Sequence, residues 1–293
     1  MTMSHPKYQK QHRISKVYLK EFGYQKDGKW YISIWEKSKD YTDNILIEEF
    51  TTETNIFDLP FDEASIKRHF EDTSQKIETQ YKIVLNAIKK QQQLTHRHQD
   101  LLCHYTANLI CRSKLNRAYF QSRLNSEIAI SCFLEEITMF EPESLQELKG
   151  MLLLVPSEHR LNLVIGNVMN YLVRVLRCFS FSILEAIPDR GWFTTDNPVL
   201  IDPQEAANIE STEYLYIIPV ESEIYLPLSP EYCLFGFHKK SNKQENPLRK
   251  VPLNKICKID EETHDRICKM ILGNGSQYFI FNQEIKNIFL CEL

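Results

Sequence analysis

The chain has 293 residues, of which 43% are hydrophobic and 11% aromatic, so it can bury a substantial core and is not a disordered chain. Its 35 Lys and Arg residues nearly balance 39 Asp and Glu residues, for a net charge of −4. This balance excludes a general electrostatic attraction to nucleic acid or to an anionic membrane, although a local basic patch stays open. The longest apolar run, Met151 to Val155, is too short to cross a bilayer, and the N-terminus lacks an apolar leader. We therefore expect a cytoplasmic protein with no membrane segment.

The eight cysteines are widely and irregularly spaced, and no Cys-x-x-Cys pair occurs. This pattern predicts neither a zinc site nor a disulfide framework. We interpret the cysteines as buried thiols in a reducing compartment.

The N-terminal part predicts a short helix and then a strand. Apolar residues recur at helical spacing within residues 12–22, and Ser15 is a suitable cap. Asp27 and Gly28 favour a tight turn, and the bulky β-forming residues at 30–37 predict a strand after it. The following stretch, 38–54, is polar with scattered apolar residues.

The middle of the chain predicts a large helical layer. From Ala64 the apolar residues recur with a period near 3.6, which indicates a long helix to about residue 88. Similar patterns predict helices over 101–120 and 128–140, and Pro142 and Ser157 favour two further helix starts. We interpret the whole chain, 1–293, as a single domain with a helical insertion at about 63–179.

The remaining part is dominated by short aromatic or β-branched runs between turn-forming residues. Strands are predicted at 181–185, 191–201, 214–218, 224–228, 232–237 and 277–281. A helix is predicted over 260–272, ending at Gly273. We expect these strands to form one sheet. The order of strands, helices and strands predicts an α+β fold, an antiparallel-leaning sheet from N-terminal and C-terminal strands with a large central helical layer.

The stretch Gly191 to Ile201 places polar residues between two apolar runs, so Asp196 and Asn197 are expected near the end of a sheet. Two interpretations are open. In the structural one, the two side chains bond their own backbone two residues on, as in an Asx turn, and Pro198 fixes the exit. In the functional one, Asp196 is a metal ligand or general base and Asn197 orients a substrate.

His12 is the natural partner for that stretch. A neutral imidazole near pH 7 can move a proton or bind a metal, and a carboxylate such as Asp196 can orient it. The alternative is a surface or capping histidine on the short N-terminal helix.

Basic residues also gather between 112 and 123. Arg112, Lys114, Arg117 and Arg123 predict either a phosphate-facing stripe or an ordinary solvated helix surface. The first three of them do not share one face cleanly. No phosphate-cradling glycine loop, dinucleotide fingerprint, zinc-protease motif or nucleophile elbow occurs.

Three segments resemble a bacterial family known only as domain of unknown function 4238. They are the opening box, in which His12 precedes Tyr18-Leu19 and Phe22, the central box Thr194–Val199, and the later box Pro227–Pro230. Members of that family have been implicated in defence against phage, and the resemblance implies the same role here. It brings no established chemistry with it.

Two functions follow as hypotheses. The first is an antiphage hydrolase, nuclease-like and dependent on a divalent metal, that acts on nucleic acid or nucleotides. His12 would be its acid or base, and Asp196 and Asn197 would hold metal or substrate. The second is a non-enzymatic sensor or interaction module, in which the helical layer binds a phage protein and the boxes only join strands.

Overall fold

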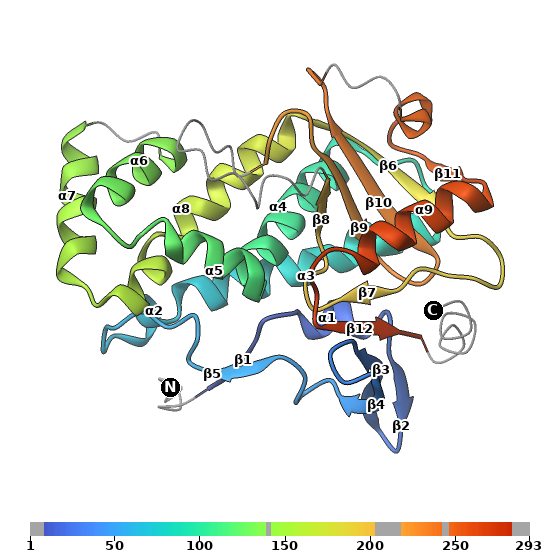
Figure 1. The fold of residues 1–293 in the computed structure, drawn as a ribbon, viewed down its shortest axis with the longest axis horizontal. Coiled ribbons are helices and arrows are strands. Elements are labelled where there is room, and N and C mark those ends of the chain that lie inside the picture. Colours follow the sequence, from blue (N-terminus) through green and yellow to red (C-terminus); the bar gives the residue numbers. More distant parts are fainter. Residues whose placement is uncertain (1–8, 139–141, 203–217, 242–245, 283–293) are drawn as a thin grey trace.

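The computed structural model describes residues 9–138, 142–202, 218–241 and 246–282. Its strands lie in the first and last parts of the chain and its longest helices in the middle, so the predicted α+β class is confirmed (Figure 1). The predicted strand at 214–218 lies almost wholly outside the described residues.

The first part of the chain is mostly strand. The elements are β1 (Lys10–His12), α1 (Lys16–Leu19), β2 (Tyr24–Lys26), β3 (Lys29–Glu36), β4 (Tyr41–Leu46) and β5 (Thr52–Thr54). Ser15 caps α1 as predicted, because its Oγ accepts the N–H of Tyr18 at 3.4 Å. Asp27 and Gly28, both with positive φ, form the predicted turn between β2 and β3. The strands β4 and β5 arise in the polar stretch 38–54 because they pair with β3 and β1.

The helical layer follows. It consists of α2 (Ala64–Lys67), α3 (His69–Lys89), α4 (His96–Arg112), α5 (Lys114–Ser122), α6 (Glu127–Ile137), α7 (Pro142–Leu154) and α8 (Ser157–Arg177). The predicted helix over 101–120 is broken at Ser113, which takes an extended conformation and caps α5 by accepting the N–H of Asn116 at 3.3 Å. Pro142 begins α7 as predicted, whereas Pro156, and not Ser157, is the N-cap of α8. The long helix α4 packs against both α3 and α8.

The last part returns to strands. Its elements are β6 (Phe179–Glu185), β7 (Thr194–Thr195), β8 (Leu200–Asp202), β9 (Glu223–Pro227), β10 (Tyr232–His238), the 3-10 helix η2 (Pro247–Lys250), β11 (Ile256–Lys258), α9 (Glu261–Leu272) and β12 (Tyr278–Phe281). Asp260 caps α9 through the N–H of Thr263 at 2.8 Å. Gly273 follows the end of α9, as predicted.

These strands form two main sheets in the described part of the chain, not the single sheet that we expected. One has the order β11-β6-β10-β9-β8 and is antiparallel except for the β11–β6 pair. The other has the order β2-β3-β12-β7. The strand β4 also pairs with β3, along the edge opposite β12. β12 lies between β3 and β7 because Ile280 faces Ile34 on one side and Thr194 on the other. The second sheet therefore joins the two ends of the chain, and the antiparallel tendency is confirmed.

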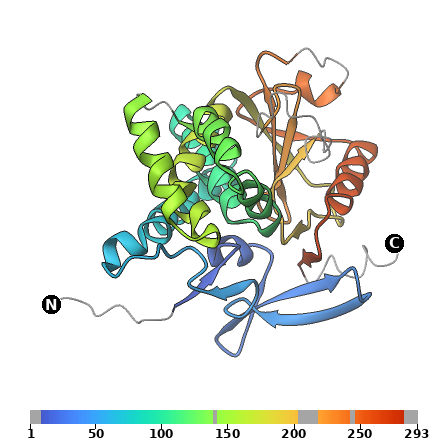
Figure 2. The ribbon, with the colours of Figure 1, turned by 60° about the vertical axis from the view of Figure 1, so that its left-hand side comes forward.

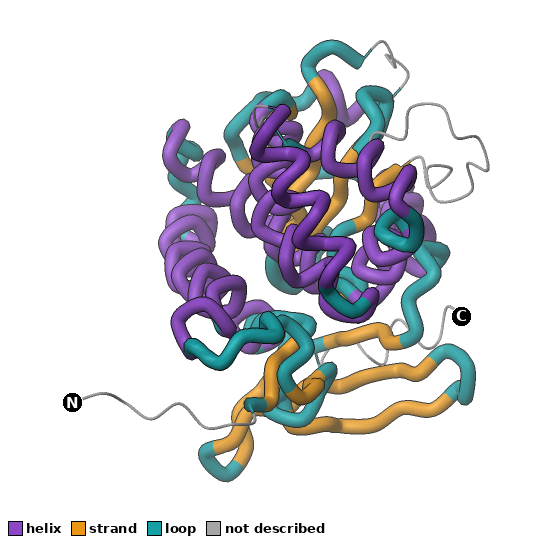
Figure 3. Tube along the Cα trace, turned by 90° about the vertical axis from the view of Figure 1, so that its left-hand side faces the viewer, coloured by secondary structure: helices purple, strands orange, loops and turns teal. Residues whose placement is uncertain are grey.

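The five-stranded sheet β11-β6-β10-β9-β8, here named the β6–β10 sheet, lies between two layers. The helical layer covers one face and α9 covers the other (Figures 1 and 2). Along β9, Ile224 and Leu226 pack with the helical layer, whereas Tyr225 packs with Ile267 of α9. A strand covered on both faces is apolar at successive positions, which explains the unbroken apolar runs in the sequence. Figure 3 shows strands beneath the helices, and among them β12 pairs with β3.

Seven cysteines fall in the described residues, and all are free thiols. Cys132 and Cys178 are exposed, so the prediction of buried thiols is wrong for these two. Cys132 lies on the solvent-facing side of α6, and Cys178 directly follows the end of α8. No described helix is both long enough and apolar enough to cross a membrane.

Candidate functional site

The three boxes meet at the hydroxyl of Tyr18. This side chain is fully buried on α1, and its oxygen lies 2.6 Å from the carbonyl of Pro227 and 2.6 Å from Oγ1 of Thr194. A carbonyl only accepts, so Tyr18 donates to Pro227 and the hydroxyl of Thr194 donates to Tyr18. Burial raises the pKa of Tyr18 well above its ordinary value, which keeps the donor protonated. One side chain therefore joins α1, β7 and β9.

The later box is also fastened to the helical layer. Tyr81 of α3 donates its hydroxyl to the carbonyl of Leu228 at 3.0 Å. The ring of Tyr81 stacks on that of Tyr105 of α4, with centroids 3.8 Å apart and planes 7° from parallel. Tyr81 and Tyr105 thus connect the later box to the helices α3 and α4.

Asp196 binds the start of β12. Its Oδ1 accepts the N–H groups of Gln277 at 3.0 Å and Tyr278 at 3.2 Å, and its own N–H donates to the carbonyl of Tyr278 at 3.1 Å. The side chains of Asp196 and Asn197 bond distant residues in place of the predicted Asx turn. The turn is closed by Thr195, whose Oγ1 accepts from the N–H of Asn197 at 3.1 Å and donates to the carbonyl of Asn197 at 2.8 Å. Burial raises the pKa of the Asp196 carboxyl, and the two main-chain donors partly oppose this.

Asn197 points into the junction between α4 and α5. Its Oδ1 accepts from the hydroxyl of Ser113 at 2.6 Å and from Nδ2 of Asn116 at 3.3 Å. Its carbonyl accepts from Nδ2 of Asn274, just after α9, at 3.2 Å. The side chain is 8% exposed and connects the central box to the helical layer.

His12 is buried at the end of β1. Its Nδ1 lies 3.3 Å from the carbonyl of Phe50, and only a protonated Nδ1 can donate there. Burial, reinforced by the positive charge of Lys16, lowers the pKa of His12 to about 4, so the ring is neutral at pH 7. The carbonyl of His12 accepts from the guanidinium of Arg112.

The three predicted site residues are linked only indirectly. In the described part of the chain no hydrogen bond or ion pair joins the ring of His12 to the carboxylate of Asp196. Phe50, which binds His12, packs edge-on against Tyr278, which binds Asp196, with ring centroids 5.6 Å apart. On the other side, Arg112 holds His12 and the next residue, Ser113, holds Asn197. The side chains therefore surround a packed junction.

Comparison with known proteins identifies the chain at the level of its family. A family model described as a protein of unknown function, DUF4238, matches residues 10–284. The chain belongs to the DUF4238 family. The match includes all three boxes, in agreement with the resemblance seen in the sequence. No curated protein and no solved structure matches the chain.

Within the described residues of this DUF4238 protein, no group of three or more His, Cys, Asp or Glu side chains is arranged to hold a metal ion. The Asp196 carboxylate accepts from the main-chain N–H groups of Gln277 and Tyr278 and interacts with the side chain of Ser276. The assignment of Asp196 as a metal ligand and the catalytic assignments of His12, Asp196 and Asn197 stay predictions.

Several polar residues that surround the central box in this DUF4238 protein were not predicted from the sequence. They are Ser113, Asn116, Asn274 and Ser276, each bonded to the central box or to a residue that bonds it. Only one local signal was available, since Ser113 followed by Asn116 is compatible with a helix cap inside an otherwise helical pattern.

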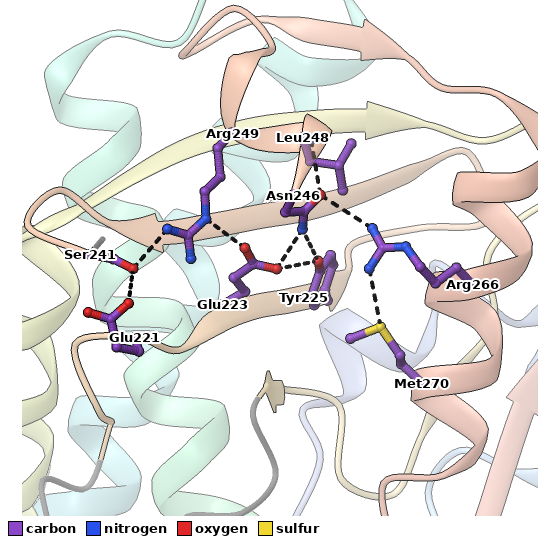
Figure 4. A network of polar contacts seen from close by, with 9 residues as sticks. All are labelled: Glu221, Glu223, Tyr225, Ser241, Asn246, Leu248, Arg249, Arg266 and Met270. Carbon is purple, nitrogen blue, oxygen red and sulfur yellow. Dashed lines mark hydrogen bonds and ion pairs between the residues drawn. The ribbon is translucent and has the colours of Figure 1, made fainter. Parts of the chain in front are cut away.

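A second polar cluster lies on the face of the β6–β10 sheet that α9 covers (Figure 4). Glu223 is 3% exposed and accepts from Nε of Arg249 at 2.7 Å, from Nδ2 of Asn246 at 2.6 Å and from the hydroxyl of Tyr225 at 2.9 Å. Arg249 also donates to the hydroxyl of Ser241 at 2.8 Å. Three donors converge on the buried carboxylate of Glu223, and Arg249 supplies the compensating positive charge, so the cluster connects β9 to η2.

The DUF4238 chain also has a pocket of about 710 Å³ between the end of β6 and the start of α9. Its charged lining residues are Glu185, Asp189, Glu231, Lys258 and Glu261. Pro230, the last residue of the later box, forms part of the wall. Four carboxylates and one lysine make the lining acidic, although one of the carboxylates, Glu261, pairs with Arg190.

The raised pKa of Asp196 gives a pH-dependent prediction. A carboxyl whose pKa is raised on folding contributes stability that is present below its unfolded pKa, about 4, and lost as the pH rises through the folded value. Asp196→Asn keeps the Oδ1 acceptor and carries no charge. We expect the variant to be at least as stable as the wild type at pH 7, and this advantage to shrink as the pH falls towards 4. Urea unfolding of both proteins at the two pH values measures the difference. A variant that is less stable by more than about 1 kcal/mol at pH 7 contradicts the assignment.

Proposed function

We propose that this chain is a non-enzymatic interaction module of bacterial defence against phage, which acts in the cytoplasm and senses a phage protein through its helical layer. The defence role rests on the resemblance of the three boxes to a family implicated in it. The binding role rests on an exposed apolar surface, and the contacts of the box residues favour a structural part for them.

The surface that carries the proposal is formed by Ile128, Met151, Leu153 and Leu154, here named the α6–α7 surface. Ile128 is 79% exposed and Leu154 88% exposed, and Met151 and Leu153 are 47% and 40% exposed. An ion pair of 2.9 Å between Lys149 in the middle of α7 and Glu127 at the start of α6 shows that the two helices are neighbours. Met151 and Leu154 lie one turn apart and share a face of α7, whereas Leu153 lies on another side of that helix. Exposed apolar residues on neighbouring helices are typical of a protein-binding surface.

The position of this surface fits a binding role. In Figure 1, α7 is the outermost helix of the layer and lies far from the strands that carry the boxes. Leu152, between two exposed neighbours, is 0% exposed and anchors α7 to the core. The helix is thus fixed on one side and open to a partner on the other.

Two substitutions test the proposal in cells. Ile128→Glu and Leu154→Glu place a charge on the α6–α7 surface, and each is expected to weaken partner binding by about 2 kcal/mol, roughly 30-fold. Protection, measured as phage plating efficiency, should fall. The melting temperature should stay close to that of the wild type because both side chains are exposed.

A matched control is Tyr41→Glu, which adds the same charge on β4, where Tyr41 is 54% exposed. Full protection by this variant together with loss of protection by the other two supports the proposal. If Ile128→Glu and Leu154→Glu protect as well as Tyr41→Glu does, the α6–α7 surface is not the binding surface.

A further inference from the structure

Arg117 of α5 is a buried cation without an ion-pair partner in the described part of the chain. It is 9% exposed, and its Nη2 donates to neutral acceptors, Oδ1 of Asn162 at 2.7 Å and the carbonyl of Ile56 at 3.4 Å. Its Nη1 is buried and bonds to nothing. An unpaired buried charge is costly to a fold, and proteins generally pair such groups or use them to hold a ligand.

Two further arginines surround this cation. The guanidinium of Arg112 lies 4.5 Å from the ring centroid of Phe57, and that of Arg117 lies 4.9 Å from the same centroid. Arg112 pairs with Glu71 at 2.9 Å, and Arg13 pairs with Glu53. Glu71 and Glu53 each pair with one of these arginines, and Glu78 also lies near Arg112. Arg117, although Glu53 is near enough to act on it, forms no ion pair of its own in the described residues. Burial, with the charge of Arg13 beside it, lowers the pKa of Arg117 to about 10, which still leaves it charged at pH 7.

The cluster is accessible from the side of Arg13. The side chain of Arg13 is 14% exposed and that of its partner Glu53 is 48% exposed. The pair is partly exposed through Glu53, so Arg13 exchanges this partner more easily than it would in a fully buried pair. An anion that reaches Arg13 can replace Glu53 as its partner. It can also accept a hydrogen bond from Nη1 of Arg117, which has no acceptor.

We propose that Arg117 and Arg13 bind the phosphate group of a small ligand at the edge between α5 and β1. A phosphate dianion suits the site because guanidinium groups bind its oxygens in fork geometry, and because its charge compensates more than one arginine. His12, which is neutral at pH 7, lies near Lys16 and Arg112, and the carboxylate near it is Glu48. The site is separate from the α6–α7 surface, so it stands independently of the proposed function.

Thermal unfolding of the full chain tests this site. The probes are inorganic phosphate and a nucleoside monophosphate, each added at constant ionic strength with sodium chloride as the balancing salt. Saturating ligand is expected to raise the Tm of the wild type by about 4 °C. Arg117→Met should abolish the rise, and Arg13→Met, which alters a more exposed side chain, should reduce it. Arg123→Met is the matched control, since Arg123 ends the same helix and pairs with Glu136 at 3.3 Å.

The two ligands separate the sources of the phosphate. Equal shifts indicate a site for the phosphate group alone, and a larger shift with the nucleotide indicates that the rest of the ligand also binds. No shift with either ligand in the wild type overturns the proposal, as does an equal shift in Arg13→Met and the wild type. If Arg117→Met fails to fold, Arg13→Met and phosphorus NMR line broadening of the free phosphate decide the question.

Discussion

Arg249→Met is expected to lower the free energy of unfolding by about 3–5 kcal/mol, because it removes the charge that compensates a buried carboxylate. Glu223 is 3% exposed and lies 2.7 Å from Nε of Arg249. Without the guanidinium, Tyr225 and Asn246 still donate to Glu223, but both donors are neutral. In the variant the buried carboxylate of Glu223, at the centre of the cluster in Figure 4, has lost the guanidinium that compensated its charge, so its burial becomes costly.

Urea unfolding at pH 7 measures this loss. Arg266→Met is the matched control, because Arg266 is exposed and its guanidinium donates to Asn246 at 3.4 Å and to the sulfur of Met270, with the charge of Asp260 nearby. The control should cost less than about 1 kcal/mol. Equal costs for the two variants would show that the Glu223–Arg249 pair adds nothing specific. The double variant Glu223→Gln with Arg249→Met should recover part of the loss, since no charge is then left unpaired.

Tyr18→Phe is expected to cost about 2–4 kcal/mol, because one deleted hydroxyl leaves two buried groups without their partner. The carbonyl of Pro227 loses its donor and the hydroxyl of Thr194 loses its acceptor. Tyr18 and Thr194 are both 0% exposed, so water cannot replace the missing oxygen without opening the core. The ring itself stays packed against Phe22.

Two other tyrosines calibrate this effect. Tyr81→Phe removes a single hydrogen bond, to the carbonyl of Leu228, and should cost about 1–2 kcal/mol. Tyr41→Phe changes a side chain that is 54% exposed and should stay within about 0.5 kcal/mol of the wild type. A double-mutant cycle of Tyr18→Phe with Thr194→Val should give a coupling energy above about 0.5 kcal/mol. A coupling near zero would mean that Tyr18 does not join α1 to β7.

Local signals in the sequence predicted much of the fold. The Asp27-Gly28 turn, the Ser15 cap and the end of α9 before Gly273 each depend on a few neighbouring residues. Sheet membership was predicted wrongly, because a strand's alternation does not specify which strand it pairs with. β12 lies between β3 and β7, strands that are distant in sequence, and nothing local to Tyr278–Phe281 indicates this.

The candidate site shows the same limit. Tyr18 lies on the apolar face of a short helix, where a pattern predicts burial, but its hydroxyl partners are 176 and 209 residues away. The burial of Arg112 and Arg117 was also missed. The break at Ser113 reorients α5 relative to α4, so both arginines face the core although one continuous helix would place them on different faces.

Phage plating on cells that produce Asp196→Asn tests most directly whether the central box is structural. Asparagine retains an Oδ1 that accepts from the N–H groups of Gln277 and Tyr278, so we predict protection equal to that of the wild type. A metal-dependent hydrolase with His12, Asp196 and Asn197 at its centre requires the carboxylate itself. Loss of protection by about 100-fold or more in a variant of unchanged stability would contradict the structural assignment.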